Sequence, residues 1–479
     1  MFDKERDLAS TFAAGRIGRR ELMQRASRLG LGVAAASFFV NESMTRALAA
    51  DFDWQKHKGK TINLLLNKHP YTDALIADLH NFKDLTGMAV KYDVFPEDVY
   101  FDKVTAALSS RSTQYDAFMT GAYQTWQYGP AGWLVDMNEY IKDSSKTNPH
   151  YNWDDVLPNL RASTAWSGVP GAALGGEGAK QWAVPWGFEL NSVSYNKRIF
   201  DQLKIEPPTN LADMKEKAAK ITKDAGGPYG IGVRGSRSWA TIHPGYLSGF
   251  SNYGARDFNV ADGKLKAAMN SPDGKEFTKQ WVEMIQESGP KNWSTYTWYQ
   301  VGTDLGAGAS GMIFDADILG YFQNSPTTKE HGNIAFHAFA ANPKATQPTP
   351  NVWIWSLGMN AFGQQPDAAW DFVQWASSTE HDLFGARKMD FVNPVRSSVW
   401  KDEEFRARIA KSYPGYLEQY EASAPGSKIY FTPQPLFFNL TTDWAASLQK
   451  MVAKEVPVDE GLDQLAQNVD RQLKQAGLG

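Results

Sequence analysis

The residues Thr61-Ile62-Asn63-Leu64-Leu65-Leu66 form a short apolar run that predicts a buried strand. Apolar residues then recur at helical spacing from Leu75 to Leu85, and the pattern stops at Gly87. Residues 89–94 and 115–120 repeat the strand pattern, with another helical stripe between them. Strand, helix, strand, helix and strand in this order predict a parallel, doubly wound α/β sheet with right-handed crossovers.

The rest of the chain shows the same alternation. Extended segments are expected at residues 182–195, 229–235, 311–315 and 352–359, and helices at residues 211–222, 273–288, 366–378 and 459–474. These elements predict a second α/β lobe. Because no low-complexity linker separates the two parts, we expect several short connections between them.

The composition excludes several classes of protein. The chain has 479 residues, a length typical of two large lobes, and its 49 basic and 53 acidic residues leave a formal charge of −4, which argues against nucleic-acid binding. It has no Cys, so disulfides, iron–sulfur clusters and thioether lipid anchors are excluded. We find no nucleophile elbow, zinc-protease, Walker or EF-hand motif, and we expect no catalytic residues, metal or cofactor.

The first 49 residues read as an export signal of the twin-arginine type. Arg19-Arg20 lies in a basic stretch, the uncharged segment 29–40 follows, and Ala47-Leu48-Ala49 is a signal-peptidase site, so cleavage is expected after Ala49. The apolar segment is shorter than the roughly 20 residues that span a bilayer. The general secretory route accepts similar segments, so both export routes stay open.

Four motifs in order resemble a known family. They are Gly132-Trp133-Leu134-Val135-Asp136-Met137, then Val193-Ser194-Tyr195-Asn196 with Pro207-Pro208-Thr209, then Gly311-Met312-Ile313-Phe314-Asp315, and finally Val392-Asn393-Pro394-Val395-Arg396-Ser397-Ser398. Over residues 58–479 the chain is similar to the extracellular solute-binding proteins of carbohydrate ABC importers, the group that includes maltose-binding protein.

The resemblance implies a type II periplasmic binding protein fold. Each lobe would be a doubly wound, mostly parallel sheet flanked by helices, hinged by three crossings near residues 187–190, 355–361 and 427–432. The N-terminal lobe would hold residues 50–187 and 361–426, and the C-terminal lobe residues 188–358 and 431–479. Residues 168–178 and 414–426 read as insertions relative to the family.

The resemblance also implies a function. A periplasmic, monomeric receptor would capture a sugar, oligosaccharide or polyol in the interlobe cleft and deliver it to the transmembrane subunits of an ABC permease. Lipid-anchored relatives attach through a Cys that this chain lacks, so we expect an unanchored protein.

A polyhydroxyl solute needs rings for its C–H faces and polar groups for its hydroxyls, and 17 Trp, 19 Tyr and 26 Phe supply many rings. Ligands of parallel sheets collect at the carboxyl ends of the strands. By position or by resemblance, the candidate ligand-binding residues are Asn67, His69, Tyr71, Tyr123, Trp126, Trp186, Glu189, Arg234, Trp239, Asp315, Trp353, Trp355 and Arg396.

Several of these candidates have a structural alternative. Residues 67–71 and Asp315 could instead cap helices, Trp126 could pack under a loop, and Arg396 could brace one. Trp353 and Trp355 alternate along one extended segment, so we expect them to point to opposite sides, with Trp355 facing the ligand.

Two other functions stay open from the sequence. An exported carbohydrate-active enzyme could use Glu189 or Asp315, although glycoside hydrolysis needs two carboxyl groups about 5–9.5 Å apart. A receptor for a charged organic solute could gather His69, Arg234, Arg237 and Arg396 around an anionic group.

Overall fold

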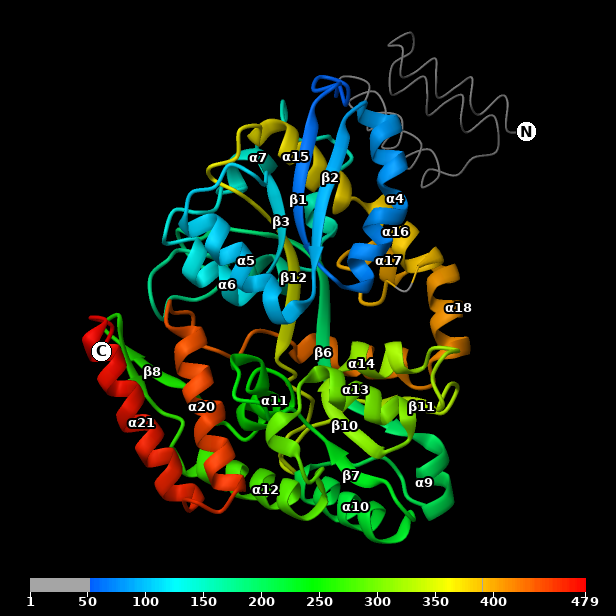
Figure 1. Ribbon diagram of the computed structural model, residues 1–479, viewed down its shortest axis with the longest axis vertical. Helices are drawn as coiled ribbons and strands as arrows, with labels where there is room; N and C mark the ends of the chain where they lie inside the picture. Colours follow the sequence, from blue (N-terminus) through cyan, green and yellow to red (C-terminus); the bar gives the residue numbers. More distant parts are fainter. Residues whose placement is uncertain (1–51, 390) are drawn as a thin grey trace, which may run out of the picture.

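The computed structural model describes residues 52–389 and 391–479. The expected export signal therefore lies outside the described residues. Figure 1 shows two α/β halves stacked along the long axis, with β6 (Val184–Asn196) and β12 (Val352–Met359) running through the region where they meet.

The first half begins as the sequence predicts. Strands β1 (Thr61–Asn67), β2 (Ala89–Phe95) and β3 (Ala117–Gly121) alternate with helices α4 (Pro70–Thr86), α5 (Glu97–Ser109) and α6 (Ala122–Tyr128). β1 pairs in parallel with both β2 and β3, which confirms the doubly wound start. Helix α4 ends at Gly87, whose φ of 68° is the left-handed conformation that glycine adopts readily.

The second half is organised around β6. It contains α9 (Lys197–Leu203), α10 (Leu211–Asp224), β7 (Tyr229–Gly232), α12 (Pro272–Ser288), β10 (Ser310–Ala316), α14 (Asp317–Gln323) and β11 (Ile334–His337). β10 pairs in parallel with β7, whereas β10 and β11 both run antiparallel to β6. As Ser271-Pro272 suggests, Ser271 caps α12 and accepts a hydrogen bond from the Gly274 backbone N–H.

The remaining elements complete the two halves. They are α7 (Asn138–Ile141), η1 (Trp153–Asp155), α8 (Pro158–Ser163), β4 (Ala165–Trp166), β5 (Lys180–Gln181), η2 (Trp239–Thr241), α11 (Gly245–Asn252), β8 (Phe258–Ala261), β9 (Lys264–Ala267), η3 (Trp293–Thr295), α13 (Trp298–Ala307), α15 (Pro366–Ala376), α16 (Thr379–Lys388), α17 (Ser397–Trp400), α18 (Glu403–Ser412), α19 (Tyr416–Ser423), η4 (Ala424–Gly426), α20 (Phe437–Val452) and α21 (Val458–Gln475).

Eight of the strands form one continuous sheet in the order β2-β1-β3-β12-β6-β10-β7, with β11 also paired to β6, whereas β4-β5 and β8-β9 are separate two-stranded sheets. β12 runs antiparallel to both β3 and β6. The expectation of mostly parallel sheets is therefore wrong, because the strands that cross between the halves run against their neighbours.

β6 joins the two halves directly. It pairs with β12 as far as Leu190 and with β10 from Asn191 onward. Twelve of its thirteen residues are buried, so it is covered on both faces in each half. The same backbone strand thus belongs to both halves, and side chains near residues 189–191 lie where the halves meet.

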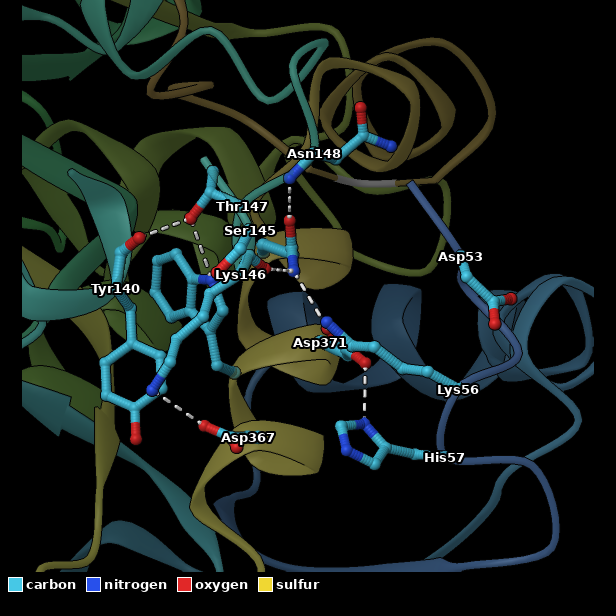
Figure 2. A network of polar contacts seen from close by, with 12 residues as sticks. Asp53, Lys56, His57, Tyr140, Ser145, Lys146, Thr147, Asn148, Asp367 and Asp371 are labelled. Carbon is cyan, nitrogen blue, oxygen red and sulfur yellow. Dashed lines mark hydrogen bonds and ion pairs between the residues drawn. The ribbon is translucent and has the colours of Figure 1, made fainter. Parts of the chain in front are cut away.

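A buried carboxylate ties the start of the described chain to α15. Asp371 accepts a hydrogen bond from His57 Nδ1 at 2.9 Å and lies 3.2 Å from Lys56 Nζ, and Gln374 Nε2 donates to its other oxygen (Figure 2). Gln374 also accepts from the Asn148 backbone N–H, so three segments that are distant in sequence share one polar cluster.

None of the helices in residues 52–389 and 391–479 combines the length and the apolar character needed to cross a membrane.

Close packing beside β6 yields a stability prediction. A Cβ on Gly187 would overlap the buried Tyr71 ring, so we expect Gly187→Ala to destabilise the fold by about 1–3 kcal/mol through overpacking. Thermal unfolding followed by circular dichroism measures the effect. In the control Gly302→Ala, the nearest atoms lie 3.6 Å from the new Cβ within α13, so its melting temperature should stay level or rise. Equal melting temperatures for both variants would contradict this packing argument.

Candidate ligand-binding site

A small polar cavity with aromatic walls lies where the two halves meet. It measures about 20 Å³ and is lined by His69, Glu97, Glu189, Arg234, Trp239, His243, Trp298, Ile318, Leu319, Trp353 and Trp355. His69 and Glu97 come from the first half, at the starts of α4 and α5, which follow β1 and β2. The carboxyl ends of β1 and β2 in the first half therefore face the loops and helices of the second half.

Tryptophan rings form the walls. The rings of Trp353 and Trp355 lie 5.1 Å apart at 80°, and Trp239 lies 5.4 Å from Trp353 at 28°. Both tryptophans of β12 line the cavity, so the expectation that they point to opposite sides is wrong. Residues two apart on a strand share one face, since neighbouring side chains alternate.

β6 supplies the central polar group. Glu189 lies directly opposite Trp353 in the β6–β12 pairing, and its Oε1 accepts a hydrogen bond from Trp355 Nε1 at 2.8 Å. Burial raises the pKa of Glu189 to about 8, although nearby Arg234 opposes the rise. Near neutral pH this carboxyl is therefore mainly protonated and can both donate and accept a hydrogen bond.

Arg234 and Asp315 form a buried ion pair beside the cavity. Arg234 Nε donates to Asp315 Oδ2 at 3.0 Å and Nη2 to Oδ1 at 2.7 Å, while Nη1 donates to the Ala240 carbonyl. Burial acts to lower the pKa of Arg234, but the charge of Asp315 outweighs it and the pKa is raised. Both Asp315 oxygens are thus engaged by the guanidinium, and Asp315 lies inside β10 rather than capping α14.

Two neutral histidines complete the polar lining. His69 caps α4 by accepting from the Tyr71 backbone N–H at 3.3 Å, and burial lowers its pKa to about 3. Burial also lowers the pKa of His243 well below its usual value, and Arg234 adds to that effect. Because His69 Nδ1 already accepts the hydrogen bond from the Tyr71 backbone, the neutral ring carries its hydrogen on Nε2 and has one donor left for a solute.

Six of the predicted residues line this cavity, namely His69, Glu189, Arg234, Trp239, Trp353 and Trp355. The other seven, which are Asn67, Tyr71, Tyr123, Trp126, Trp186, Asp315 and Arg396, are buried but are not among its lining residues.

The reasons differ from residue to residue. Tyr71 donates through its hydroxyl to the Val392 carbonyl at 2.6 Å, and the Tyr123 hydroxyl accepts from Asn351 Nδ2. Trp126 and Trp186 pack on other rings, Trp126 against Tyr123 and Trp186 against Tyr71. These side chains build the core under the cavity.

Arg396 braces loops instead of reaching the cavity. Its Nε donates to the Ser377 carbonyl at 2.8 Å, its Nη1 donates to the Asn152 carbonyl, and the side chain is fully buried. Of the two alternatives open from the sequence, the structure selects the brace.

Sequence reasoning missed Glu97, His243 and Trp298. Glu97 follows β2 at the same carboxyl edge as His69, so the strand-end rule could have found it. Trp298 follows Thr297, which with Gln300 forms a capping box and marks the start of α13. No local pattern marks His243, which stacks on Trp239 at 5.5 Å and 24°.

Two α/β halves joined by a shared strand, with an aromatic and polar cavity between them, define a solute-binding protein. The family model of the bacterial extracellular solute-binding protein matches residues 67–382, and the chain belongs to this family. It is the solute-binding protein of an ABC transporter, not an enzyme, and the family is extracellular or periplasmic.

Similar proteins include receptors for polyols. An erythritol/L-threitol-binding protein of Mycolicibacterium smegmatis is 42% identical over 83% of each chain. A mannitol-binding protein of Pseudomonas aeruginosa is 22% identical over 81% of this chain and 87% of its own. The crystal structure of an ABC transporter solute-binding protein from Agrobacterium vitis with bound D-mannitol superposes with a TM-score of 0.72 at 23% identity, over 88% of this chain and 99% of that one. This superposition supports the α/β periplasmic binding protein fold.

The raised pKa of Glu189 predicts a pH-dependent stability. The Glu189 carboxyl has a pKa near 4.3 in the unfolded chain and of about 8 in the folded chain. At pH values between these two, the folded chain keeps a proton that the unfolded chain releases. The contribution of Glu189 to the free energy of unfolding therefore falls as pH rises. The wild type should therefore lose stability relative to Glu189→Gln from pH 5 to 8, by at least about 4 °C in melting temperature. Thermal scans at several pH values test this, with exposed Glu139→Gln as control. If the difference in melting temperature between wild type and Glu189→Gln stays constant with pH, the raised pKa of Glu189 is refuted.

Proposed function

We propose that this protein binds a short acyclic polyol, a four-carbon tetritol such as erythritol or L-threitol, and delivers it to an ABC permease. The observation that carries the proposal is the small cavity in which tryptophan rings surround buried hydrogen-bonding groups. The 42% identical erythritol/L-threitol-binding protein supports the same solute class.

The chemistry of the lining suits a neutral polyol. Rings of Trp239, Trp353 and Trp355 offer flat apolar surface to C–H groups, while Glu189 and the two histidines offer donors and acceptors to hydroxyls. Each buried hydroxyl left unpaired costs about 1–3 kcal/mol, so these polar groups select the arrangement of hydroxyls.

The volume of the cavity favours a short solute. A space of about 20 Å³ holds roughly one water molecule, so a solute enters only if the halves part or side chains move. A small opening admits a chain of a few carbons, whereas an oligosaccharide requires a much larger one.

An anionic solute is disfavoured by the ion pair. The Arg234 guanidinium is already paired in a bidentate manner with Asp315, and Glu97 adds an acidic group to the lining. Arg396 is buried elsewhere. The arginines that could gather around an anion are therefore engaged or distant from the cavity.

Capture would proceed by closure of two lobes around the solute. We infer hinge crossings near residues 187–190, 355–361 and 427–432, with residues 50–187 plus 361–426 in one lobe and 188–358 plus 431–479 in the other. A solute that contacts both lobes favours the closed form, and the closed surface would then dock on the permease. The signal expected in residues 1–49, whether it uses the twin-arginine or the general secretory route, would export an unanchored receptor to the periplasm.

Calorimetry and thermal shift with purified protein test the proposal. We expect erythritol or L-threitol to raise the melting temperature and to bind more tightly than maltose. Trp353→Ala should weaken binding about tenfold or more by removing a wall, whereas Trp375→Ala, in α15 outside the cavity, should leave affinity unchanged. Binding of maltose without binding of any polyol would refute the proposal.

A further inference from the structure

A second, larger hollow adjoins the cavity and shares four lining residues with it; we call it the outer hollow. This outer hollow measures about 550 Å³ and is lined by Pro96, Glu97, Phe101, Asp102, Arg234, Ser236, Ser238, Trp239, Ala240, Thr297, Trp298 and Tyr299. Glu97, Arg234, Trp239 and Trp298 line both spaces, and we call these four residues the collar. The collar thus consists of the side chains that the small inner cavity and the larger outer hollow have in common.

The four collar residues are held to different degrees. Arg234 is fixed by its bidentate pair with Asp315, and Trp239 is stacked against His243 and Trp353. Trp298 is the first residue of α13, is half-buried, and stacks on exposed Tyr299 with ring centroids 3.8 Å apart. Trp298 therefore stacks on a ring of the outer hollow, whereas Trp239 stacks on rings of the inner cavity.

The outer hollow can also hydrogen-bond hydroxyl groups. Ser236, Ser238 and Thr297 bring side-chain hydroxyls, and Asp102 brings an exposed carboxylate. A polyol too long for the inner cavity would find partners here if the collar let its end pass. Space and polar groups for a longer chain therefore exist in the outer hollow, which Trp298 lines together with the cavity.

Building on the proposed function, we propose that Trp298 determines specificity by limiting the chain length of the bound polyol. Once the halves part far enough to admit a solute, a four-carbon chain stays within the collar, whereas the end of a five- or six-carbon chain meets the Trp298 ring. Removing that ring joins the inner cavity to the outer hollow and gives a longer chain a continuous site.

Calorimetric titration of erythritol, ribitol and D-mannitol into wild type, Trp298→Ala, Trp298→Phe and Tyr92→Ala tests this. We expect the ratio of the D-mannitol Kd to the erythritol Kd to fall by roughly tenfold or more in Trp298→Ala, and partway in Trp298→Phe. Tyr92→Ala is the control, because Tyr92 is a ring of β2 that is 41% exposed and lines neither the cavity nor the outer hollow, and its ratio should equal that of the wild type.

Circular dichroism and the melting temperature show whether each variant folds, and Trp298→Phe keeps the test valid if Trp298→Ala does not. An unchanged ratio in a folded Trp298 variant overturns the length limit, as does an equal change in Tyr92→Ala. Wild type that binds D-mannitol as tightly as erythritol also overturns it. If wild type binds erythritol but the ratio does not move, the length limit alone fails and the proposed function stands. If wild type binds no polyol, both fail.

Discussion

The structure depends on one strand that two halves share. β6 pairs with β12 up to Leu190 and with β10 from Asn191, so neither half can complete its sheet without it. Since buried backbone groups must find hydrogen-bond partners, this pairing fixes where the halves meet. Glu189 lies at the change of partner, which places its carboxyl between the halves.

β12, the strand paired with β6, carries the tryptophans of the cavity wall. Trp353 faces Glu189 and Trp355 faces Gly187 across the β6–β12 pair, so one face of the two strands presents a carboxyl and two indoles. The absent side chain of Gly187 leaves room for the ring of Tyr71, and a Cβ on Gly121 would overlap Trp353. Glycines at the strand crossings thus let large rings pack against the backbone from both sides.

Burial decides the charges around the cavity. An isolated buried charge is costly, and the groups here avoid that cost by pairing, as Arg234 does with Asp315, or by neutrality, as Glu189 and His69 do. A lining of neutral donors and acceptors between indole rings matches a neutral polyhydroxyl solute better than an ion. The inner cavity thus selects the chemical class of the solute, and Trp298 of the collar limits its chain length.

The sequence by itself determined the order and bounds of the main elements, because apolar periodicity and end signals are local. β12 at residues 352–359, α12 after Ser271-Pro272 and α4 ending before Gly87 follow directly from such patterns. The strand-end rule also led to His69, and family motifs led to Glu189 and Trp355. Only the tertiary structure decided which residues meet at the cavity. Tyr71 and Arg396 carry the same chemistry as true lining residues, but their hydroxyl and guanidinium bind carbonyls of distant segments. His243 and Trp298 reach the site through contacts among elements far apart in the chain, and no local pattern encodes such contacts because they depend on packing.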